Sequence, residues 1–326
     1  MFGSGKIRTG IDLGTGSVKI VRIKGIDQSA TITHAGFEPW PQAEESADLA
    51  EPAAVALSRL LARFGLRKNS LGRIAVAVSG EETSLREVFL PPLSDAEMRM
   101  ALPFEARRHL NLEDMSSPQL DFQILGPAPR SEEEDQEQVR VLLAAVPRQV
   151  RDFPVRVLAR LGLEPEVVDL EPLAGLNALM AHQNGELEAK RVVGLLDLGR
   201  RRACLHVTGC NGGFLSRTVG PGHPGEDAGE RVAAYRERLT ERIRETLTYY
   251  RGRFRQEVAQ IHLAGGGSLL RDLASDLREA LERPVAVLDP LTHRLAKTRG
   301  AAEVEGMGSR FVVAWGLCQW WNRGDV

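Results

Sequence analysis

The stretch that decides the fold lies near the N-terminus and reads Gly10-Ile11-Asp12-Leu13-Gly14-Thr15-Gly16-Ser17-Val18-Lys19. The short apolar run over 7–13 predicts a buried strand, and the apolar residues of 18–23 predict a second strand that returns beside it. The turn between them contains two glycines, so backbone N–H groups can close around phosphate oxygens with no Cβ in the way. Asp12 ends the first strand and could hold Mg²⁺ through water, because magnesium keeps several waters and takes few carboxylates. Alone, this pattern is equally typical of an ordinary tight β-turn.

Two later stretches have related patterns and favour a phosphate site. Residues 192–199 repeat the apolar run and end it with Asp197-Leu198-Gly199, and residues 203–207 predict the strand that returns. Residues 261–268 predict a strand that runs into Gly265-Gly266-Gly267-Ser268, where a helix is expected to open. A helix N-terminus offers free N–H groups and the positive end of its dipole, which suits the phosphates of a nucleotide.

The composition is that of an ordinary globular protein and excludes several classes of function. At 326 residues the chain is long enough for two domains with substantial cores, and 43% of it is hydrophobic. The net charge of −2 provides no basic field that would favour nucleic acid. No segment has the pattern of a signal peptide or the length of a membrane span. We therefore expect a cytoplasmic protein that reaches a membrane only through a partner.

The order of the patterns predicts two domains. The first covers 1–190 and contains an inserted α+β subdomain at about 84–146. The second covers 191–326 and ends with a closing helix over 308–321. That helix carries three tryptophans, which we expect to pack in the core or at an interface.

The predicted insert has one helix between short strands. Ser94-Asp95-Ala96-Glu97 is a capping box and predicts a helix that runs to about Leu110. Pro103 falls inside this helix, so a kink or a delayed start is expected. The alternation of Leu120, Phe122 and Ile124 predicts a strand, and residues 139–146 predict the strand that returns. The acidic run Glu132-Glu133-Glu134-Asp135 between them is expected to be a solvated loop tip.

Two Asp-Leu-Gly hairpins followed by one Gly-Gly-Gly turn resemble the phosphate-1, phosphate-2 and adenosine motifs of the actin-like ATPase superfamily. This resemblance implies an α/β fold with duplicated actin-like (ribonuclease H-like) ATPase domains that face a nucleotide cleft. Within the superfamily the chain is similar, over nearly its whole length, to the PilM family of type IV pilus assembly proteins. It is more distantly similar to the cytoplasmic part of GspL-like type II secretion proteins. The stretches that carry the PilM-like similarity are Glu97–Leu110, Leu120–Gly126, Val141–Arg148 and Gly162–Asp169.

The PilM-like resemblance implies a scaffold at the cytoplasmic face of the inner membrane, associated with it peripherally through a partner. PilM-like proteins bind ATP between their two domains. They also bind the short N-terminal tail of a PilN-like single-span inner-membrane protein, on the first domain and its insert. A related type II secretion platform fits the same pattern. An actin-like small-molecule kinase and a filament-forming cytoskeletal protein stay open as alternatives, as does homo-oligomer formation.

The resemblance also implies the site residues by position. They are, for the first phosphate loop, Asp12, Gly14, Thr15, Gly16 and Ser17; for the second, Asp197 and Gly199; and for the adenosine loop, Gly265, Gly266, Gly267 and Ser268. Asp12 and Asp197 would hold Mg²⁺ through water. Glu171 sits where an acidic residue positions the hydrolytic water in active relatives, although we favour a plain role at a helix start. Lys19 is expected to be an exposed strand lysine.

Two departures from the family pattern bear on the nucleotide. The second loop continues with Arg200-Arg201-Arg202 where small or hydroxyl residues are usual. These arginines could fill the pocket, neutralise a triphosphate or lie in solvent. The segment Gly220-Pro221-Gly222-His223-Pro224-Gly225 replaces a more helical start of the long helix that follows. We therefore expect binding of ATP with Mg²⁺, and at most a slow ATPase.

Overall fold

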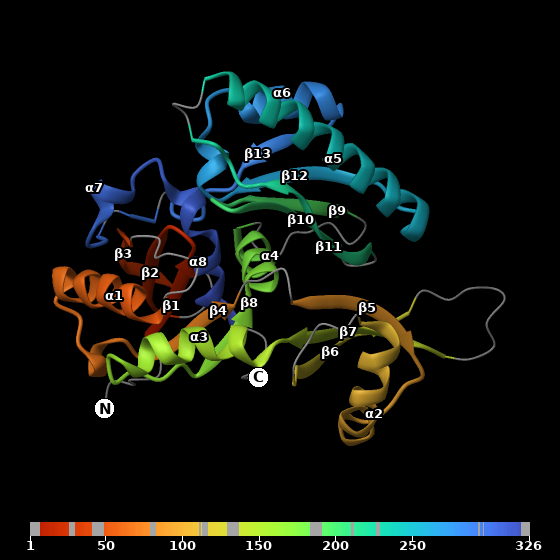
Figure 1. Cartoon of the computed structure of the whole chain (residues 1–326), viewed down its shortest axis with the longest axis horizontal. Helices are drawn as coiled ribbons and strands as arrows, with labels where there is room; N and C mark the ends of the chain where they lie inside the picture. Colours follow the sequence, from red (N-terminus) through yellow and green to blue (C-terminus); the bar gives the residue numbers. More distant parts are fainter. Residues whose placement is uncertain are drawn as a thin grey trace.

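The structure is a computed structural model of the chain and is shown in Figure 1. Its described residues form two five-stranded sheets and one three-stranded sheet. The residues that it describes are 7–25, 30–40, 49–78, 83–110, 112, 117–128, 137–182, 191–209, 212–225, 229–292, 294–295 and 297–320.

The first sheet is built on the N-terminal hairpin and has the strand order β3-β2-β1-β4-β8. β1 and β2 pair antiparallel with Gly14 opposite Ser17, so Thr15 and Gly16 alone form the turn. β4 runs parallel to β1, and β8 runs parallel to β4. The strands are β1 (Ile7–Gly14), β2 (Ser17–Lys24), β3 (Thr31–Pro39), β4 (Arg73–Val78) and β8 (Val167–Leu170).

The second sheet repeats this topology, with the order β11-β10-β9-β12-β13. β9, β10 and β11 form an antiparallel meander, and β12 and β13 continue the sheet in parallel from β9. The strands are β9 (Val192–Leu198), β10 (Arg202–Gly209), β11 (Gly212–Pro221), β12 (Val258–Ala264) and β13 (Val285–Val287). The predicted duplicated α/β fold is thereby confirmed. The predicted boundary near residue 190 adjoins 183–190, which lie outside the described residues, and it stays a prediction.

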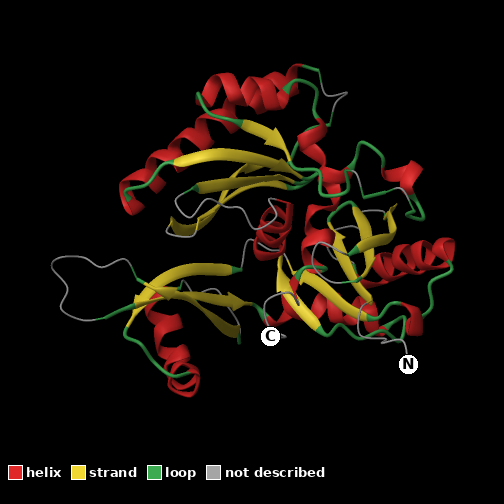
Figure 2. Cartoon of the chain, turned by 180° about the vertical axis from the view of Figure 1, so that it is seen from behind, coloured by secondary structure: helices red, strands yellow, loops and turns green. Residues whose placement is uncertain are grey.

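Helices cover both faces of each sheet, and α4 packs between the two sheets (Figures 1 and 2). Leu176 and Leu179 of α4 share one core with Val21 of the first sheet and Val193 of the second. α1 and α3 pack on the other face of the first sheet, and α5 and α6 on the outer face of the second. The helices are α1 (Ala50–Phe64), α3 (Arg148–Ala159), α4 (Glu171–His182), α5 (Glu230–Phe254), α6 (Leu273–Leu281), α7 (Ala301–Val304) and α8 (Val312–Leu317), with 3₁₀ turns η3 (Lys68–Ser70), η5 (Gly266–Leu269) and η6 (Gly308–Phe311). None of the described helices is long and apolar enough to cross a membrane.

The insert is a three-stranded antiparallel sheet with one helix packed on it. Its elements are β5 (Ser84–Leu90), α2 (Asp95–His109), β6 (Gln119–Pro127) and β7 (Val139–Val146), in the sheet order β5-β7-β6. The predicted capping box is present: the Ser94 hydroxyl accepts from Glu97 N, and the Glu97 carboxylate accepts from Ser94 N at 2.8 Å. The helix begins directly after Ser94, so Pro103 does not delay its start. The acidic run 132–135 lies outside the described residues.

Two predicted helices are shorter than expected. The glycine turn does not open an α-helix, because residues 266–269 form only a 3₁₀ turn and α6 begins at Leu273. Gly265 has a φ of +78°, and a run of glycines has low helix propensity, which explains the difference. The predicted extent of the closing helix, 308–321, is also wrong, because residues 308–311 form the 3₁₀ turn η6 and α8 ends at Leu317. Of the three tryptophans, Trp315 is buried and Trp320 is 44% exposed, and Trp321 lies outside the described residues.

Candidate nucleotide site

The two Asp-Leu-Gly turns and the glycine triplet lie together, although they are far apart in the sequence. Burial, and then the negative charge of Asp12, raise the pKa of the Asp197 carboxyl to about 6. Gly265 lies against the same carboxyl, since a Cβ there would be 2.6 Å from Asp197 Oδ1. The structure therefore brings the three predicted site loops together.

The first turn contains a buried aspartate and two glycines that side chains approach closely. Asp12 is buried, and its Oδ2 accepts a hydrogen bond from Lys19 Nζ at 2.8 Å. A Cβ on Gly14 would stand 2.9 Å from Lys19 Nζ, so the lysine lies beside the turn and not in solvent. The expectation of an exposed strand lysine is wrong, because the antiparallel register places Lys19 opposite Asp12. Thr15 and Ser17 lie in this turn and at its end.

The three arginines of the second loop point in different directions. Arg200 reaches the first loop, where a Cβ on Gly16 would stand 3.0 Å from Arg200 Cδ. Arg201 is exposed. Arg202 lies 3.4 Å from a carboxylate oxygen of Glu171, in the first turn of α4. Only Arg200 is placed to meet a ligand at both phosphate loops, and the Glu171 carboxylate is occupied by a guanidinium.

The adenosine loop is held by hydrogen bonds to η6. Gly265 N donates to Ser309 O at 2.9 Å, and the hydroxyls of Ser268 and Ser309 are 2.8 Å apart. Arg310, next to Ser309, is stacked over the Phe37 ring with its guanidinium carbon 4.5 Å from the centroid. Hydrogen bonds to Ser309 therefore fix the position of the loop, and its three glycines present only backbone atoms.

Sequence reasoning missed one residue of this site, His223. Its backbone N–H donates to Gly199 O at 3.2 Å, and its ring lies against Gly266 and Gly267. Burial, Arg200 and Arg310 lower the pKa of the His223 imidazole. The sequence signal that could have indicated His223 was the departure of segment 220–225 from the family pattern.

The residues present fit a magnesium ion held through water. Burial, and then the negative charge of Asp12, raise the pKa of Asp197, so the two carboxylates are close enough for a cation between them to relieve their repulsion. Within the described part of the chain no group of three or more His, Cys, Asp or Glu side chains could hold a metal ion directly. A cation here would therefore keep most of its water ligands and take phosphate oxygens as its other ligands.

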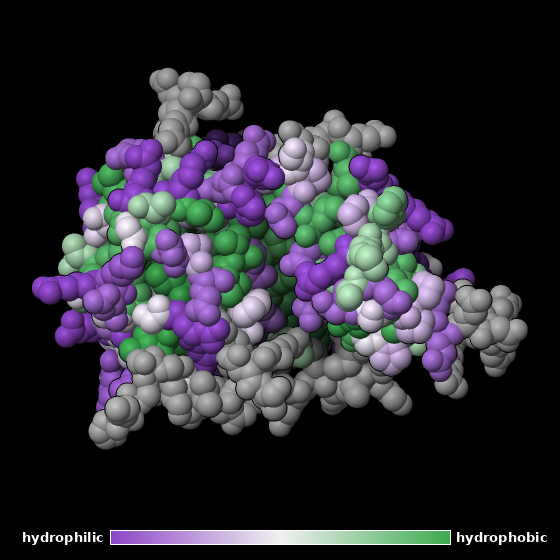
Figure 3. All heavy atoms as spheres, turned by 90° about the horizontal axis from the view of Figure 1, so that it is seen from below, coloured by the Kyte–Doolittle hydropathy of each residue, from purple (hydrophilic) through white to green (hydrophobic). Residues whose placement is uncertain are grey.

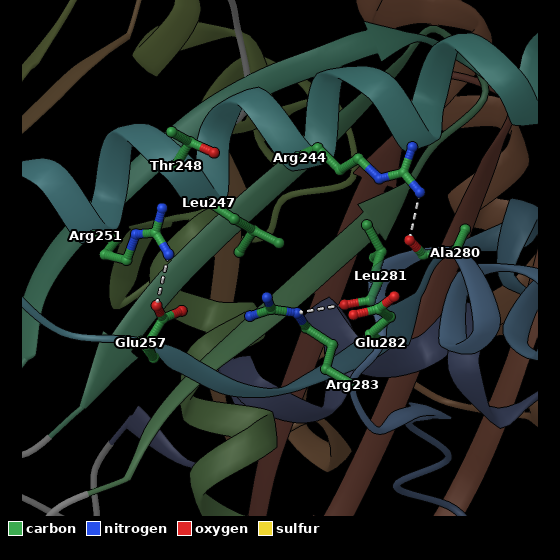
Figure 4. A pocket seen from close by; sticks show the side chains of 9 residues that line it. All are labelled: Arg244, Leu247, Thr248, Arg251, Glu257, Ala280, Leu281, Glu282 and Arg283. Carbon is green, nitrogen blue, oxygen red and sulfur yellow. Dashed lines mark hydrogen bonds and ion pairs between the residues drawn. The ribbon is translucent and has the colours of Figure 1, made fainter.

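An open surface pocket lies elsewhere, between α5 and the end of α6 (Figure 4). Its volume is about 340 Å³, and three arginines line it, Arg244, Arg251 and Arg283. They donate hydrogen bonds to backbone carbonyls or to Glu257. It shares no residue with the three loops, so we do not assign the nucleotide to it.

Comparison with known protein families gives one match that covers more than half of the chain. The family described as type IV pilus assembly protein PilM matches residues 10–222. The chain belongs to the PilM family. The matched residues include the first two phosphate loops, the whole insert and His223's neighbour Gly222, so the PilM-like resemblance of the sequence is confirmed.

Solved structures support the PilM assignment and identify the fold as that of the actin-like ATPases. This PilM-family chain is similar to the PilM–PilN type IV pilus biogenesis complex, with 26% identity and a TM-score of 0.76 over 95% of this chain and 97% of that one. The ethanolamine utilization protein EutJ from Carboxydothermus hydrogenoformans shares the fold at 13% identity and a TM-score of 0.53, over 96% and 89% of the two chains. A diol dehydratase-reactivating factor, in nucleotide-free form, does so at 11% identity and 0.53, over 98% and 100%.

Proposed function

We propose that this PilM-family chain is an ATP-binding scaffold of the type IV pilus assembly platform. In this proposal it binds the N-terminal tail of a PilN-like membrane protein. The observation that carries the proposal is the likeness to the PilM–PilN complex, which extends over 95% of the chain at a TM-score of 0.76. The scaffold would lie in the cytoplasm, peripheral to the inner membrane through its partner. Its two domains would be 1–190, with the insert, and 191–326.

ATP with Mg²⁺ is the proposed ligand of the three loops. Asp12 and Asp197 would hold the cation through water, and the cation would offset phosphate charge. The backbone of the first loop (Asp12, Gly14, Thr15, Gly16 and Ser17), with Gly199 and the adenosine loop Gly265–Ser268, would cradle the nucleotide. Arg200 adds a guanidinium that suits phosphate oxygens. Slow turnover is expected because the Glu171 carboxylate, which would have to orient a water, lies beside Arg202.

The insert is the proposed docking site for the partner tail. Its sheet order leaves β6 at an edge, where β6 pairs only with β7 among the described strands. Ile124 and Leu125 on β6 are 43% and 39% exposed. An extended tail can add to such an edge through main-chain hydrogen bonds, and neighbouring apolar side chains give specificity. Figure 3 shows hydrophobic side chains at the surface where the insert lies.

The test is a binding measurement with the full chain and a labelled peptide that carries the cytoplasmic tail of the PilN-like partner. Fluorescence anisotropy should show saturable binding that Leu125→Lys weakens about tenfold or more, because a charge would replace an apolar contact. Val55→Lys is the matched control, since Val55 on α1 is 40% exposed, like Leu125, and lies outside the insert. Equal loss in both variants would move the contact off β6. No binding to the unaltered chain would refute the partner.

A further inference from the structure

We propose that His223 contacts a phosphate of the bound nucleotide and takes up a proton when a nucleoside triphosphate binds. The inference rests on the proposed nucleotide binding. Beyond nucleotide binding, the inference assigns a binding residue outside the three glycine loops and links the affinity for the nucleotide to pH.

The position of His223 places its ring where the nucleotide is expected. Its backbone N–H is bonded to Gly199 O of the second phosphate loop at 3.2 Å. A Cβ on Gly266 would stand 3.2 Å from His223 Nε2, and one on Gly267 would stand 2.9 Å from His223 Cβ. The ring therefore lies on the bare glycine face of the adenosine loop, between that loop and the second phosphate loop.

One ring nitrogen of His223 has no hydrogen-bond partner within the part of the chain that the structure describes. Nδ1 is buried and makes no hydrogen bond to any described residue. A buried polar atom without a partner is costly, and such atoms in native proteins call for an explanation. A phosphate oxygen at this place would accept a hydrogen bond from the ring and remove that cost.

The charges around His223 favour an anion. Arg200 approaches from the β9–β10 turn and Arg310 from η6, and after burial these two cations lower the pKa of the imidazole. η5 brings no charged side chain, whereas the carboxylate of Asp197 lies against Gly265 and that of Asp289 lies against Gly308 of η6. A bound triphosphate would cancel the repulsion from both arginines. The pKa of His223 then rises on binding, and the ring takes a proton from solvent near neutral pH.

Isothermal titration calorimetry of the full chain with MgATP at pH 7.0, in two buffers of different ionisation enthalpy, counts the protons taken up. We expect wild type to take up more protons per ATP than His223→Gln. Between pH 6.5 and pH 8.0, the affinity of wild type for MgATP should fall by a factor up to about tenfold larger than that of His223→Gln. Comparing the two proteins cancels the titration of ATP itself and of Asp197. His109→Gln is the control, since His109 lies on the insert helix, and it should match wild type.

The outcomes separate this inference from the function on which it rests. Binding of MgATP with equal proton uptake in wild type and His223→Gln would overturn the role of His223 and leave nucleotide binding intact. No heat with wild type at millimolar MgATP would overturn both. A difference confined to His223→Gln, with His109→Gln unchanged, supports the inference.

Discussion

Arg200 lies directly over Gly16: a Cβ placed on Gly16 would stand 3.0 Å from Arg200 Cδ and 3.2 Å from Arg200 Nη1. The two residues belong to the first turns of the two duplicated sheets, so one side chain spans both proposed phosphate loops. A guanidinium in this place either occupies the phosphate position or binds the phosphate. Its exposed location lets it move aside and pair with an incoming anion.

Replacing Arg200 should therefore weaken ATP binding and not relieve a blockage. We expect Arg200→Ala to lower the affinity for MgATP about tenfold, because a hydrogen bond to a charged group contributes roughly 1.5–3 kcal/mol. Arg201→Ala, one residue along and exposed, is the matched control and should leave the affinity unchanged. Calorimetry with each variant measures the difference. Tighter binding in Arg200→Ala would show instead that the arginine fills the site.

Removing the charge of Asp12 should abolish the contribution of magnesium. Asp12 pairs with Lys19 at 2.8 Å and raises the pKa of Asp197, so it sets the local negative charge. We expect Asp12→Asn to bind ATP with about equal affinity with and without Mg²⁺, whereas wild type should bind about tenfold tighter with it. Asp95→Asn on the insert, 66% exposed, is the control. A magnesium effect that survives in Asp12→Asn would place the ion elsewhere.

The parts of the fold that could be predicted are those with local signals. The Asp12 and Asp197 hairpins follow from short apolar runs that end in glycine turns, and both close as expected. The Ser94 capping box fixes the start of α2 through bonds within four residues. The repeated Asp-Leu-Gly hairpin was enough to predict the duplication, because two sheets of the same topology need the same kind of turn between their first two strands.

The side-chain contacts of the site could not be predicted, because each joins residues from distant segments. Whether Arg200 or Arg202 meets Glu171 depends on the direction of β10 and the placement of α4, which no local pattern gives. The same holds for His223 and Gly267, which meet only after β11 and β12 have joined one sheet. The run Gly265–Ser268 misled the helix prediction, since the glycines serve close packing against Leu198 and His223.

Asp169 should make the protein less stable as the pH rises from about 4 to 6. Burial raises the pKa of its carboxyl to about 6, and its Oδ2 makes no hydrogen bond to a described residue. In this window the folded state holds a proton that the unfolded state has lost, so the free energy of unfolding falls with rising pH. We expect Asp169→Asn to raise that free energy at pH 7 by about 1–3 kcal/mol and to leave it nearly unchanged at pH 4. Urea denaturation at both pH values checks this, and an equal effect at both would contradict it.

A buried ion pair within the insert is hydrogen-bonded to the second sheet. Arg140 Nε donates to Glu87 Oε1 at 2.7 Å, and the other Glu87 oxygen accepts from the backbone N–H of Phe214 on β11. The Tyr250 hydroxyl of α5 donates to the neighbouring Gly213 O at 2.8 Å. The hydrogen bonds thus extend from the insert through β11 to the helix on the outer face of the second sheet. The Glu87 side chain is only 2% exposed, so its charge depends on these partners.

Removing Glu87 should be far more costly than removing an exposed partner. We expect Glu87→Ala to lower the free energy of unfolding by about 3–5 kcal/mol, because it leaves the Arg140 charge buried and the Phe214 N–H without its acceptor. Glu166→Ala is the control: it breaks the exposed pair with Arg73, whose side chains are 48% and 34% exposed, and should cost under about 1 kcal/mol. The double replacement Glu87→Leu with Arg140→Met should recover much of the loss, because it removes both charges together. Urea denaturation of the four proteins measures these differences. A cost for Glu87→Ala no larger than that of the control would mean that the insert is held to the second sheet by its apolar contacts alone.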